Sequence, residues 1–334
     1  MRILYLPNEY SQQRQREKKR KIYPVIMAME AEFCRKQGHE VYWGRSDRNY
    51  NFIFDYGDHL VLPYDKVITE PEGLPFLSLP HPDRVFTQWW EFQDNGNFKY
   101  HPGTYIQAAN GCWWGKCSFC VEQKNKWEVR PVYDVISEIN ECQALGFKEI
   151  FDDSGTFPIG RWLDEFCRKF NKSTGHNKLK IGCNMRLVDI DYDMLYHSNF
   201  RMLLFGLESA NQSTLDKIRK GVKVEDVKYI IKAAKAGLEP HICVIFGIPG
   251  ETDSDAIKTL KLVHYLLRKG YAKTAQASFY QVPGETGNET HRKFIKRIYE
   301  AAYSPQFWFN QIKDIKNIAD LKYLWRKIKA GLSR

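Results

Sequence analysis

The chain has 334 residues, of which 43% are hydrophobic and 27% are charged, and its net charge is +10. This composition is typical of a globular protein, so it excludes disordered, collagen-like and coiled-coil classes. No apolar run reaches the roughly 20 residues that span a membrane, and no signal-peptide core follows Met1. We therefore expect a cytoplasmic protein whose eight cysteines are thiols or metal ligands rather than disulfides.

Basic residues are concentrated in two regions of the sequence. The run Arg14–Lys21 contains six Lys or Arg residues and one acid, and a second basic region extends from Arg292 to Arg334. Such regions bind phosphate or anionic lipid, or they form a solvated surface. The composition leaves both interpretations open.

The first hundred residues predict a small N-terminal α/β unit followed by a linker. A strand at Arg2–Leu6, a helix at Pro24–Gln37 and a strand at Glu40–Trp43 form one strand–helix–strand pattern. Residues 46–103 are irregular, with short candidate strands at Phe52–Phe54 and His59–Val61.

From about residue 104, strand and helix patterns alternate regularly. The expected strands are Tyr105–Ala109, Glu149–Phe151, Leu179–Cys183, Met202–Gly206, His241–Phe246 and Ala275–Tyr280. The expected helices are Tyr133–Leu145, Arg161–Phe170, Tyr192–Ser198, Ser213–Arg219 with Val224–Ala236, and Thr252–Lys269. Six such units imply parallel strands with right-handed crossovers. The sequence therefore predicts an open, partial (β/α)6 TIM-like barrel over residues 101–288, after the unit at 1–100 and before a helical extension at 289–334.

The C-terminal extension predicts three helices, Thr290–Ala302, Pro305–Lys316 and Ile318–Ala330. Apolar residues recur at near-helical spacing with lysines between them: Ile312, Ile315, Ile318, Leu321, Leu324 and Ile328. We expect this stripe to pack on the barrel. The alternative is that the basic face contacts an acidic membrane surface.

A polar or glycine-rich cluster follows each expected strand. The clusters are Asn110–Cys112, Asp152–Gly155, Asn184–Arg186, Leu207–Ser209, Gly247–Glu251 and Val282–Glu285. The loops at the carboxyl ends of parallel barrel strands build active sites. Six clusters on one rim therefore indicate a catalytic face.

Three cysteines, Cys112, Cys117 and Cys120, lie within nine residues in the spacing C-x4-C-x2-C. Thiolates this close in sequence can bind one ion or one cluster. A structural zinc site normally has a fourth ligand at a matching spacing, and the other five cysteines are isolated. Three ligands from one loop suit an iron–sulfur cluster with one iron left open. A zinc site and unligated thiols remain the alternatives.

In these motifs the sequence resembles the radical S-adenosylmethionine (SAM) superfamily over about Pro102 to Leu332. It most resembles the branch that often has an N-terminal cobalamin-binding domain and shares its core with methylthiotransferases. The resemblance rests on the triplet with Phe119 before its last cysteine, and on Phe151–Phe157, Arg186–Asp191, Phe205–Ala210, Leu215–Gly221, Phe246–Thr252 and Pro283–Thr286. The usual triplet of the family is C-x3-C-x2-C, so this chain has one extra residue after Cys112.

The resemblance implies a [4Fe–4S] cluster held by the three cysteines, with the open iron chelating SAM. It also implies SAM contacts at Phe119, Asp152, Asp153, Ser154, Arg186, Glu208, Ser209, Gly247 and Gly250. A carboxylate after the second strand can accept hydrogen bonds from the SAM ammonium, with Asp153 the first candidate. An arginine can bind the SAM carboxylate through two hydrogen bonds.

Each of these assignments has a structural alternative. Asp152 or Ser154 could cap the next helix, and Arg186 could form a surface ion pair with Asp189 or Asp191. Gly247 and Gly250 could simply form a turn. Glu208 is the residue for which a role is best argued, because an unpaired buried carboxylate is costly.

The expected function is reductive cleavage of SAM to start radical chemistry on an unidentified small-molecule, lipid or peptide substrate. An external electron donor of the flavodoxin or ferredoxin type is expected, and nucleic acid is not expected as a partner. The Asp-x-His-x-x-Gly motif is absent, so we expect an N-terminal unit that does not bind cobalamin. A cobalamin-dependent radical SAM methyltransferase is one alternative. A non-catalytic zinc module that binds nucleic acid through Arg14–Lys21 is another.

Overall fold

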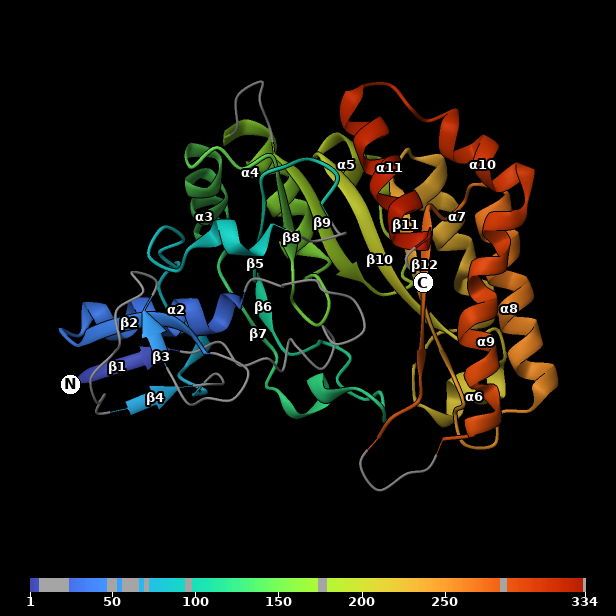
Figure 1. Ribbon diagram of the computed structural model, residues 1–334, viewed down its shortest axis with the longest axis horizontal. Coiled ribbons are helices and arrows are strands. Elements are labelled where there is room, and N and C mark those ends of the chain that lie inside the picture. Colours follow the sequence, from blue (N-terminus) through green and yellow to red (C-terminus); the bar gives the residue numbers. More distant parts are fainter. Residues whose placement is uncertain are drawn as a thin grey trace. The chain divides into compact units, whose positions relative to one another are not determined.

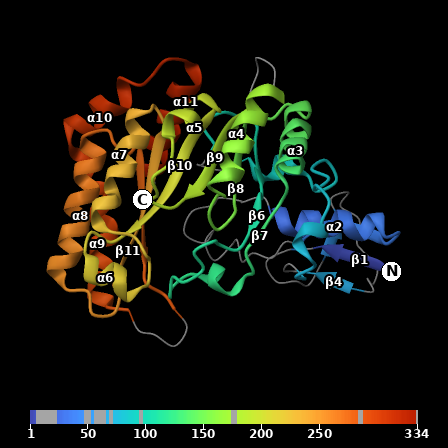
Figure 2. The same ribbon diagram turned by 180° about the vertical axis from the view of Figure 1, so that it is seen from behind.

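The computed structural model describes residues 1–5, 24–46, 53–55, 66–68, 72–93, 98–173, 179–282 and 287–332. Figures 1 and 2 show its elements from opposite sides. The chain forms two compact units: Met1–Gln107 with Glu128–Phe151, and Ala108–Trp127 with Asp152–Arg334. The basic run at 14–21, the candidate strand at 59–61 and the turn at 283–286 lie outside the described residues. The predicted division at residues 100 and 288 remains a prediction about domains.

The first unit contains a four-stranded sheet in the order β3-β2-β1-β4. Its strands are β1 (Arg2–Tyr5), β2 (Glu40–Ser46), β3 (Ile53–Asp55) and β4 (Lys66–Ile68). Helix α2 (Val25–Lys36) connects β1 to β2, which pair in parallel. This confirms the predicted strand–helix–strand pattern. Strand β4 also pairs with β1 in parallel, on the side opposite β2, which the sequence did not reveal.

Helix α3 (Val132–Ala144) is fixed in the first unit by a buried ion cluster. The carboxylate of Glu138 accepts hydrogen bonds from the guanidinium groups of Arg84 and Arg130. Burial alone would raise the pKa of Glu138, but Arg130 and Arg84 lower it to about 2. Arg130 also donates to Asp134, one turn before Glu138 on the same helix. Removing either arginine would leave buried charge without full compensation.

Six strands form one parallel sheet in the order β12-β11-β10-β9-β8-β5. They are β5 (Gly103–Ile106), β8 (Glu149–Asp152), β9 (Lys180–Met185), β10 (Phe200–Glu208), β11 (Glu239–Phe246) and β12 (Thr274–Phe279). The predicted fold class, a partial barrel with six strands, is confirmed. The carboxyl ends of parallel strands lie on one edge, so the loops after the strands share that edge.

Helices follow the strands as the sequence indicated. They are α4 (Arg161–Ser173), α5 (Tyr192–His197), α6 (Gln212–Lys217), α7 (Val227–Lys235) and α8 (Asp253–Arg268). Helix α8 begins with a capping box in which Thr252 and Asp255 satisfy each other's backbone N–H groups. No helix among the described residues is long and apolar enough to cross a bilayer.

Three further helices follow β12: α9 (Arg292–Arg297), α10 (Pro305–Ile312) and α11 (Ile318–Leu332). The expectation that their apolar stripe packs on the barrel is wrong for three of its members, because Ile312, Ile318 and Leu321 are exposed. The stripe itself exists, but the helices bury other residues. Helical spacing identifies a common face without showing which way that face is turned.

Candidate active site

The cysteine triplet lies in a loop that starts directly after the short strand β6 (Ala109–Asn110). All three cysteines are free thiols, with Cys117 buried and Cys112 and Cys120 half-buried. The backbone N–H of Cys120 donates to the carbonyl of Cys117 at 3.1 Å, which makes a tight turn between them. The N–H of Ser118 donates to the carbonyl of Ile218 at 3.0 Å. The loop is therefore attached to the segment that follows α6.

Two cations influence the buried thiol of Cys117. Burial raises its pKa above the usual value, while Lys220 and Arg186 act in the opposite direction. The pKa of Cys120 is also raised, again chiefly by burial. A thiolate in such a place needs neutralisation by cations or metal, and both cations are within the second unit.

The loop after β8 supports the start of the cysteine loop. The carboxylate of Asp152 accepts hydrogen bonds from the N–H groups of Ala108, at 2.6 Å, and Ser154, at 3.1 Å. The hydroxyl of Ser154 accepts one from the N–H of Ala109 at 2.8 Å. Both side chains are fully buried, and α4 begins only at Arg161. Asp152 and Ser154 therefore fix the approach to Cys112 and do not cap that helix.

Asp153 differs from its two neighbours because it is exposed. Asp152 and Ser154, on either side of it, are both buried. The assignment of Asp153 as the first candidate for the SAM ammonium stays a prediction, and its exposure is compatible with it.

The Arg186 guanidinium lies beside the cysteine loop. Its Nη1 is 4.0 Å from Sγ of Cys117, and its Nη2 donates to the carbonyl of Lys220 at 2.5 Å. Neither predicted surface pair forms: Asp189 binds Lys232, and Asp191 caps α5. The Nε of Arg186 is buried and has no hydrogen-bond partner among the described residues.

Two tryptophans of the cysteine loop contact the same guanidinium. The Cζ of Arg186 is 5.1 Å from the ring centre of Trp113 and 4.8 Å from that of Trp114, within the range of cation–π contacts. The indole N–H of Trp114 donates to the carbonyl of Arg219 at 2.8 Å. Its ring fills the space where Gly221, with φ +65°, would carry a Cβ, so only glycine fits there.

Glu208 ends β10 in a left-handed backbone conformation, with φ +61°. Its carboxylate accepts a hydrogen bond from Lys220 Nζ at 2.7 Å, and both side chains are buried. A Cβ on Gly206 would lie 2.4 Å from Oε1 of Glu208, so the glycine makes room for the pair. Strained non-glycine residues concentrate at functional sites. The structure therefore pairs the carboxylate of Glu208, which the sequence analysis selected, with Lys220. The sequence analysis did not predict this partner.

The neighbouring Ser209 is also buried and hydrogen-bonded. Its hydroxyl lies 3.3 Å from that of Thr259 on α8 and accepts a hydrogen bond from the N–H of Asn211. Phe119 packs against an apolar cluster of Ile218, Ile245, Ile248 and Tyr280. Lys220 Nζ is 5.8 Å from the Phe119 ring, so Phe119 connects the cysteine loop with the end of β11.

The loop after β11 is held by a buried histidine that the sequence analysis missed. His291 Nδ1 is 2.9 Å from Oε2 of Glu251, and its Nε2 is 2.9 Å from Oδ1 of Asp253. Oε2 of Glu251 also accepts the N–H of Gly247. Burial raises the pKa of Glu251, with the hydrogen bonds acting against it. Gly247 and Gly250 both have positive φ, at +82° and +79°, as the predicted turn requires.

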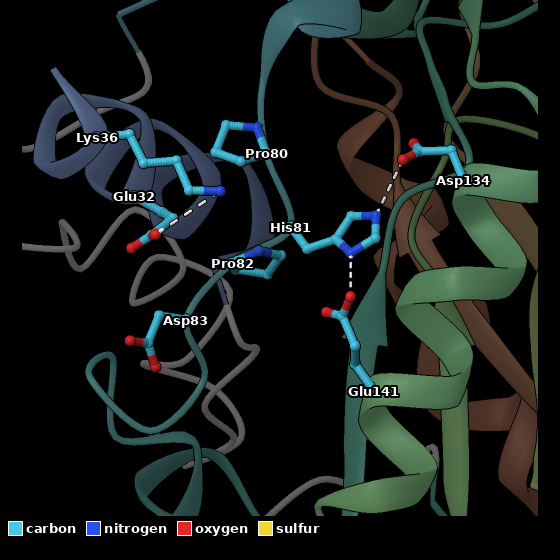
Figure 3. Close-up of a pocket in the computed structure, with 8 residues that line it drawn as sticks. All are labelled: Glu32, Lys36, Pro80, His81, Pro82, Asp83, Asp134 and Glu141. Carbon is cyan, nitrogen blue, oxygen red and sulfur yellow. Dashed lines mark hydrogen bonds and ion pairs between the residues drawn. The ribbon is translucent and has the colours of Figure 1, made fainter.

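A separate pocket of about 400 Å³ lies entirely within the first unit (Figure 3). His81 is at its centre, with Nδ1 2.8 Å from Glu141 and Nε2 3.0 Å from Asp134. The remaining lining residues are Glu32, Lys36, Pro80, Pro82 and Asp83. Both ring nitrogens of His81 are engaged by carboxylates, and no residue of the cysteine loop lines this pocket.

The donor set of the loop fits an iron–sulfur cluster. It offers three free thiols on nine residues, two nearby cations, and an unpaired buried N–H on Arg186 and on Trp113. Within the described ranges, no three His, Cys, Asp or Glu side chains are grouped so as to hold a single metal ion. Thiolates are the ligands that iron–sulfur clusters use.

Residues 106–263 match the family model of the Radical SAM superfamily. This range contains the cysteine loop and the loops after β8, β9, β10 and β11. This segment belongs to the radical SAM superfamily, which implies a [4Fe–4S] cluster and SAM.

Curated methylthiotransferases are similar to about half of this chain. A tRNA-2-methylthio-N(6)-dimethylallyladenosine synthase from Bdellovibrio bacteriovorus is 26% identical over 184 residues, which cover 49% of this chain and 40% of that protein. The ribosomal protein uS12 methylthiotransferase RimO from Nitratiruptor is 26% identical over 174 residues, or 47% and 39% of the two chains. The chain thus spans about two fifths of the length of these relatives.

Solved structures of two radical SAM enzymes are also similar. TsrM from Kitasatospora setae, a methyltransferase solved with tryptophan and a SAM analogue, has a TM-score of 0.48 and 19% identity, covering 54% of this chain and 36% of its own. The cobalamin-dependent enzyme OxsB has a TM-score of 0.49 and 12% identity, and the match covers 90% of this chain and 47% of the OxsB chain.

Proposed function

We propose that this protein is a radical SAM enzyme whose Cys112, Cys117 and Cys120 hold a [4Fe–4S] cluster. When bound, that cluster supplies the electron for reductive cleavage of SAM, and radical chemistry then begins on a substrate. The observation that carries the proposal is the loop of three free thiols with Arg186 and Lys220 acting on Cys117. This loop lies inside the segment that matches the superfamily.

The protein residues around the loop stabilise negative charge. Three thiolates bring three negative charges into a partly buried place, and burial disfavours them. Arg186 offers an N–H to Cys117 and is itself held by the carbonyl of Lys220. Hydrogen bonds and positive charge at the sulfur atoms favour the more negative, reduced state of a cluster.

SAM recognition is assigned to the loops after β8 and β10. The exposed carboxylate of Asp153 would accept hydrogen bonds from the SAM ammonium, a charge-assisted contact. Glu208 would use its remaining carboxylate oxygen, because Oε1 is bound by Lys220. Losing one charge-assisted hydrogen bond costs about 1.5–3 kcal/mol. Asp153→Asn should therefore weaken SAM binding, measured by equilibrium dialysis, without changing iron content.

The test of the proposal is anaerobic reconstitution followed by analysis of iron, sulfide and SAM products. We expect about four irons and four sulfides per chain, and methionine and 5′-deoxyadenosine on adding reductant and SAM. Cys112→Ala, Cys117→Ala and Cys120→Ala should each abolish both results. Cys142→Ala is the matched control, because Cys142 is a fully buried thiol of α3. Stoichiometric zinc in protein purified without oxygen would overturn the proposal.

An external one-electron donor of the flavodoxin or ferredoxin type would complete the reaction. The substrate is assigned to the small-molecule, lipid or peptide classes. All eight cysteines are free, which suits a reducing compartment such as the cytoplasm.

A further inference from the structure

Helix α10 buries two amide side chains and exposes two large apolar side chains. Asn310 and Gln311 are buried, and their side-chain amides donate to the carbonyls of Arg268, at 2.6 Å, and Lys273, at 3.2 Å. On the same helix, Phe309 is 68% exposed and Ile312 is 57% exposed. This is the reverse of the usual arrangement of a surface helix.

Helix α11 shows the same reversal. Asp320 is buried and accepts the N–H groups of Lys316 and Asn317, and Tyr323 is buried one turn later. Its exposed apolar residues have the spacing of one helical face: Ile318 at 70%, Leu321 at 53% and Trp325 at 66%. A helix that buries an aspartate and exposes a tryptophan has an outer surface suited to contact.

The exposed charges between these apolar residues are basic. Lys313, Lys316 and Lys322 are exposed and have no ion-pair partner within the described part of the chain. The two acids of residues 305–332 are not available to balance them, because Asp314 binds Lys273 and Asp320 is buried. The same residues carry six basic side chains in sequence.

We propose that α10 and α11 form a docking surface for an anionic lipid bilayer. The outer face is defined by Phe309, Ile312, Ile318, Leu321 and Trp325 together with Lys313, Lys316 and Lys322; Figure 1 draws both helices in red. Apolar side chains with an exposed tryptophan enter the boundary of headgroups and acyl chains, and lysines attract anionic headgroups. The exposed lysines Lys313, Lys316 and Lys322 are complementary in charge to such a membrane. The proposal does not depend on the cluster or on SAM.

The test is co-sedimentation of the full chain with vesicles. One set contains phosphatidylcholine alone, and in the other phosphatidylglycerol replaces about a third of the lipid. We expect binding to the anionic vesicles that salt weakens. Leu321→Glu and Trp325→Glu should each lower the partition coefficient about tenfold or more, since each removes apolar contact and adds repulsion. Lys316→Glu and Lys322→Glu should each lower it about fivefold or more.

Two matched variants separate this surface from a general effect of charge. Tyr133 on α3 is an equally exposed large side chain, and Lys235 on α7 is an exposed lysine. Tyr133→Glu and Lys235→Glu should leave vesicle binding unchanged, with circular dichroism confirming that all variants fold. Equal losses in the controls would overturn the proposal. Failure of the unmodified chain to bind anionic vesicles would also overturn the proposal. In that case, loss of self-association or of binding to another protein in Leu321→Glu would identify the surface as a protein interface.

Discussion

Lys220 Nζ donates a hydrogen bond to Oε1 of Glu208 across 2.7 Å, and each side chain is less than a tenth exposed. The pair joins the end of β10 to the segment after α6. It also places a positive charge where it acts on Cys117. One lysine therefore serves both the strained carboxylate and the cysteine loop.

Removing one member of this pair should cost more stability than removing both. Lys220→Met leaves the buried Glu208 carboxylate without its cation, which typically costs about 3–5 kcal/mol. The double variant Lys220→Met with Glu208→Gln leaves no buried charge and should cost less. Urea unfolding of the anaerobic apoprotein measures both free energies. A double variant that loses the sum of the two single losses would show that the pair is not coupled.

Arg186 should raise the reduction potential of the bound cluster. Its guanidinium donates towards Cys117 Sγ and stabilises the more negative reduced state. Arg186→Met should therefore make the potential more negative, and Arg186→Lys should restore part of the difference. A redox titration followed by electron paramagnetic resonance measures this potential directly. Arg168→Met, at an exposed position of α4, is the control. An equal shift there, or no shift in Arg186→Met, would contradict the assignment.

Asp152 should make stability depend on pH. Burial raises its pKa to about 7, although hydrogen bonds from Ser154 and Ala108 lower it in part. The folded protein then holds a proton that the unfolded chain has lost between its ordinary pKa, 3.8, and about 7. Stability should accordingly fall as pH rises through this window, by at most about 1.4 kcal/mol per pH unit. Asp152→Asn should flatten this slope in urea unfolding between about pH 5 and about pH 7; an unchanged slope would assign the dependence to other groups.

The purified enzyme should not retain cobalamin. The prediction rests on the missing Asp-x-His-x-x-Gly motif and on the open sheet and crevice that a nucleotide-tailed ligand requires. The measurement is expression with excess hydroxocobalamin, followed by absorption spectroscopy for corrin bands. Corrin close to one per chain would make a cobalamin-dependent methyl transfer the better proposal.

The alternation of strands and helices could be read from the sequence because each element has its own periodicity. Strand β11, expected from His241, begins at Glu239 and ends at Phe246 as expected. One strand was placed wrongly. The run expected from Tyr105 to Ala109 breaks after Ile106, because the N–H groups of Ala108 and Ala109 bind the side chains of Asp152 and Ser154. The sequence of residues 105–109 gives no sign that the distant side chains of Asp152 and Ser154 accept these N–H groups.

The candidate site could also be predicted only in part from the sequence. The cysteines are close in sequence, so their spacing alone indicates a shared ligand. The contacts of Lys220, Trp114 and His291 could not be predicted, because their partners lie on segments that meet only after folding. The local sequence around Lys220 does not show that its side chain is buried beside Glu208. For α10 and α11, periodicity gave a stripe but not its direction.

The attachment of the cysteine loop has a consequence for how the loop takes its shape. Ser118 and Trp114 tie the loop to the carbonyls of Ile218 and Arg219, about a hundred residues further along the chain. The entropy cost of closing so long a loop is offset by the contacts that form when the surrounding structure folds. Both contacts are made by protein groups, so the shape of the cysteine loop depends on the folding of residues about a hundred positions away as well as on any ligand it holds.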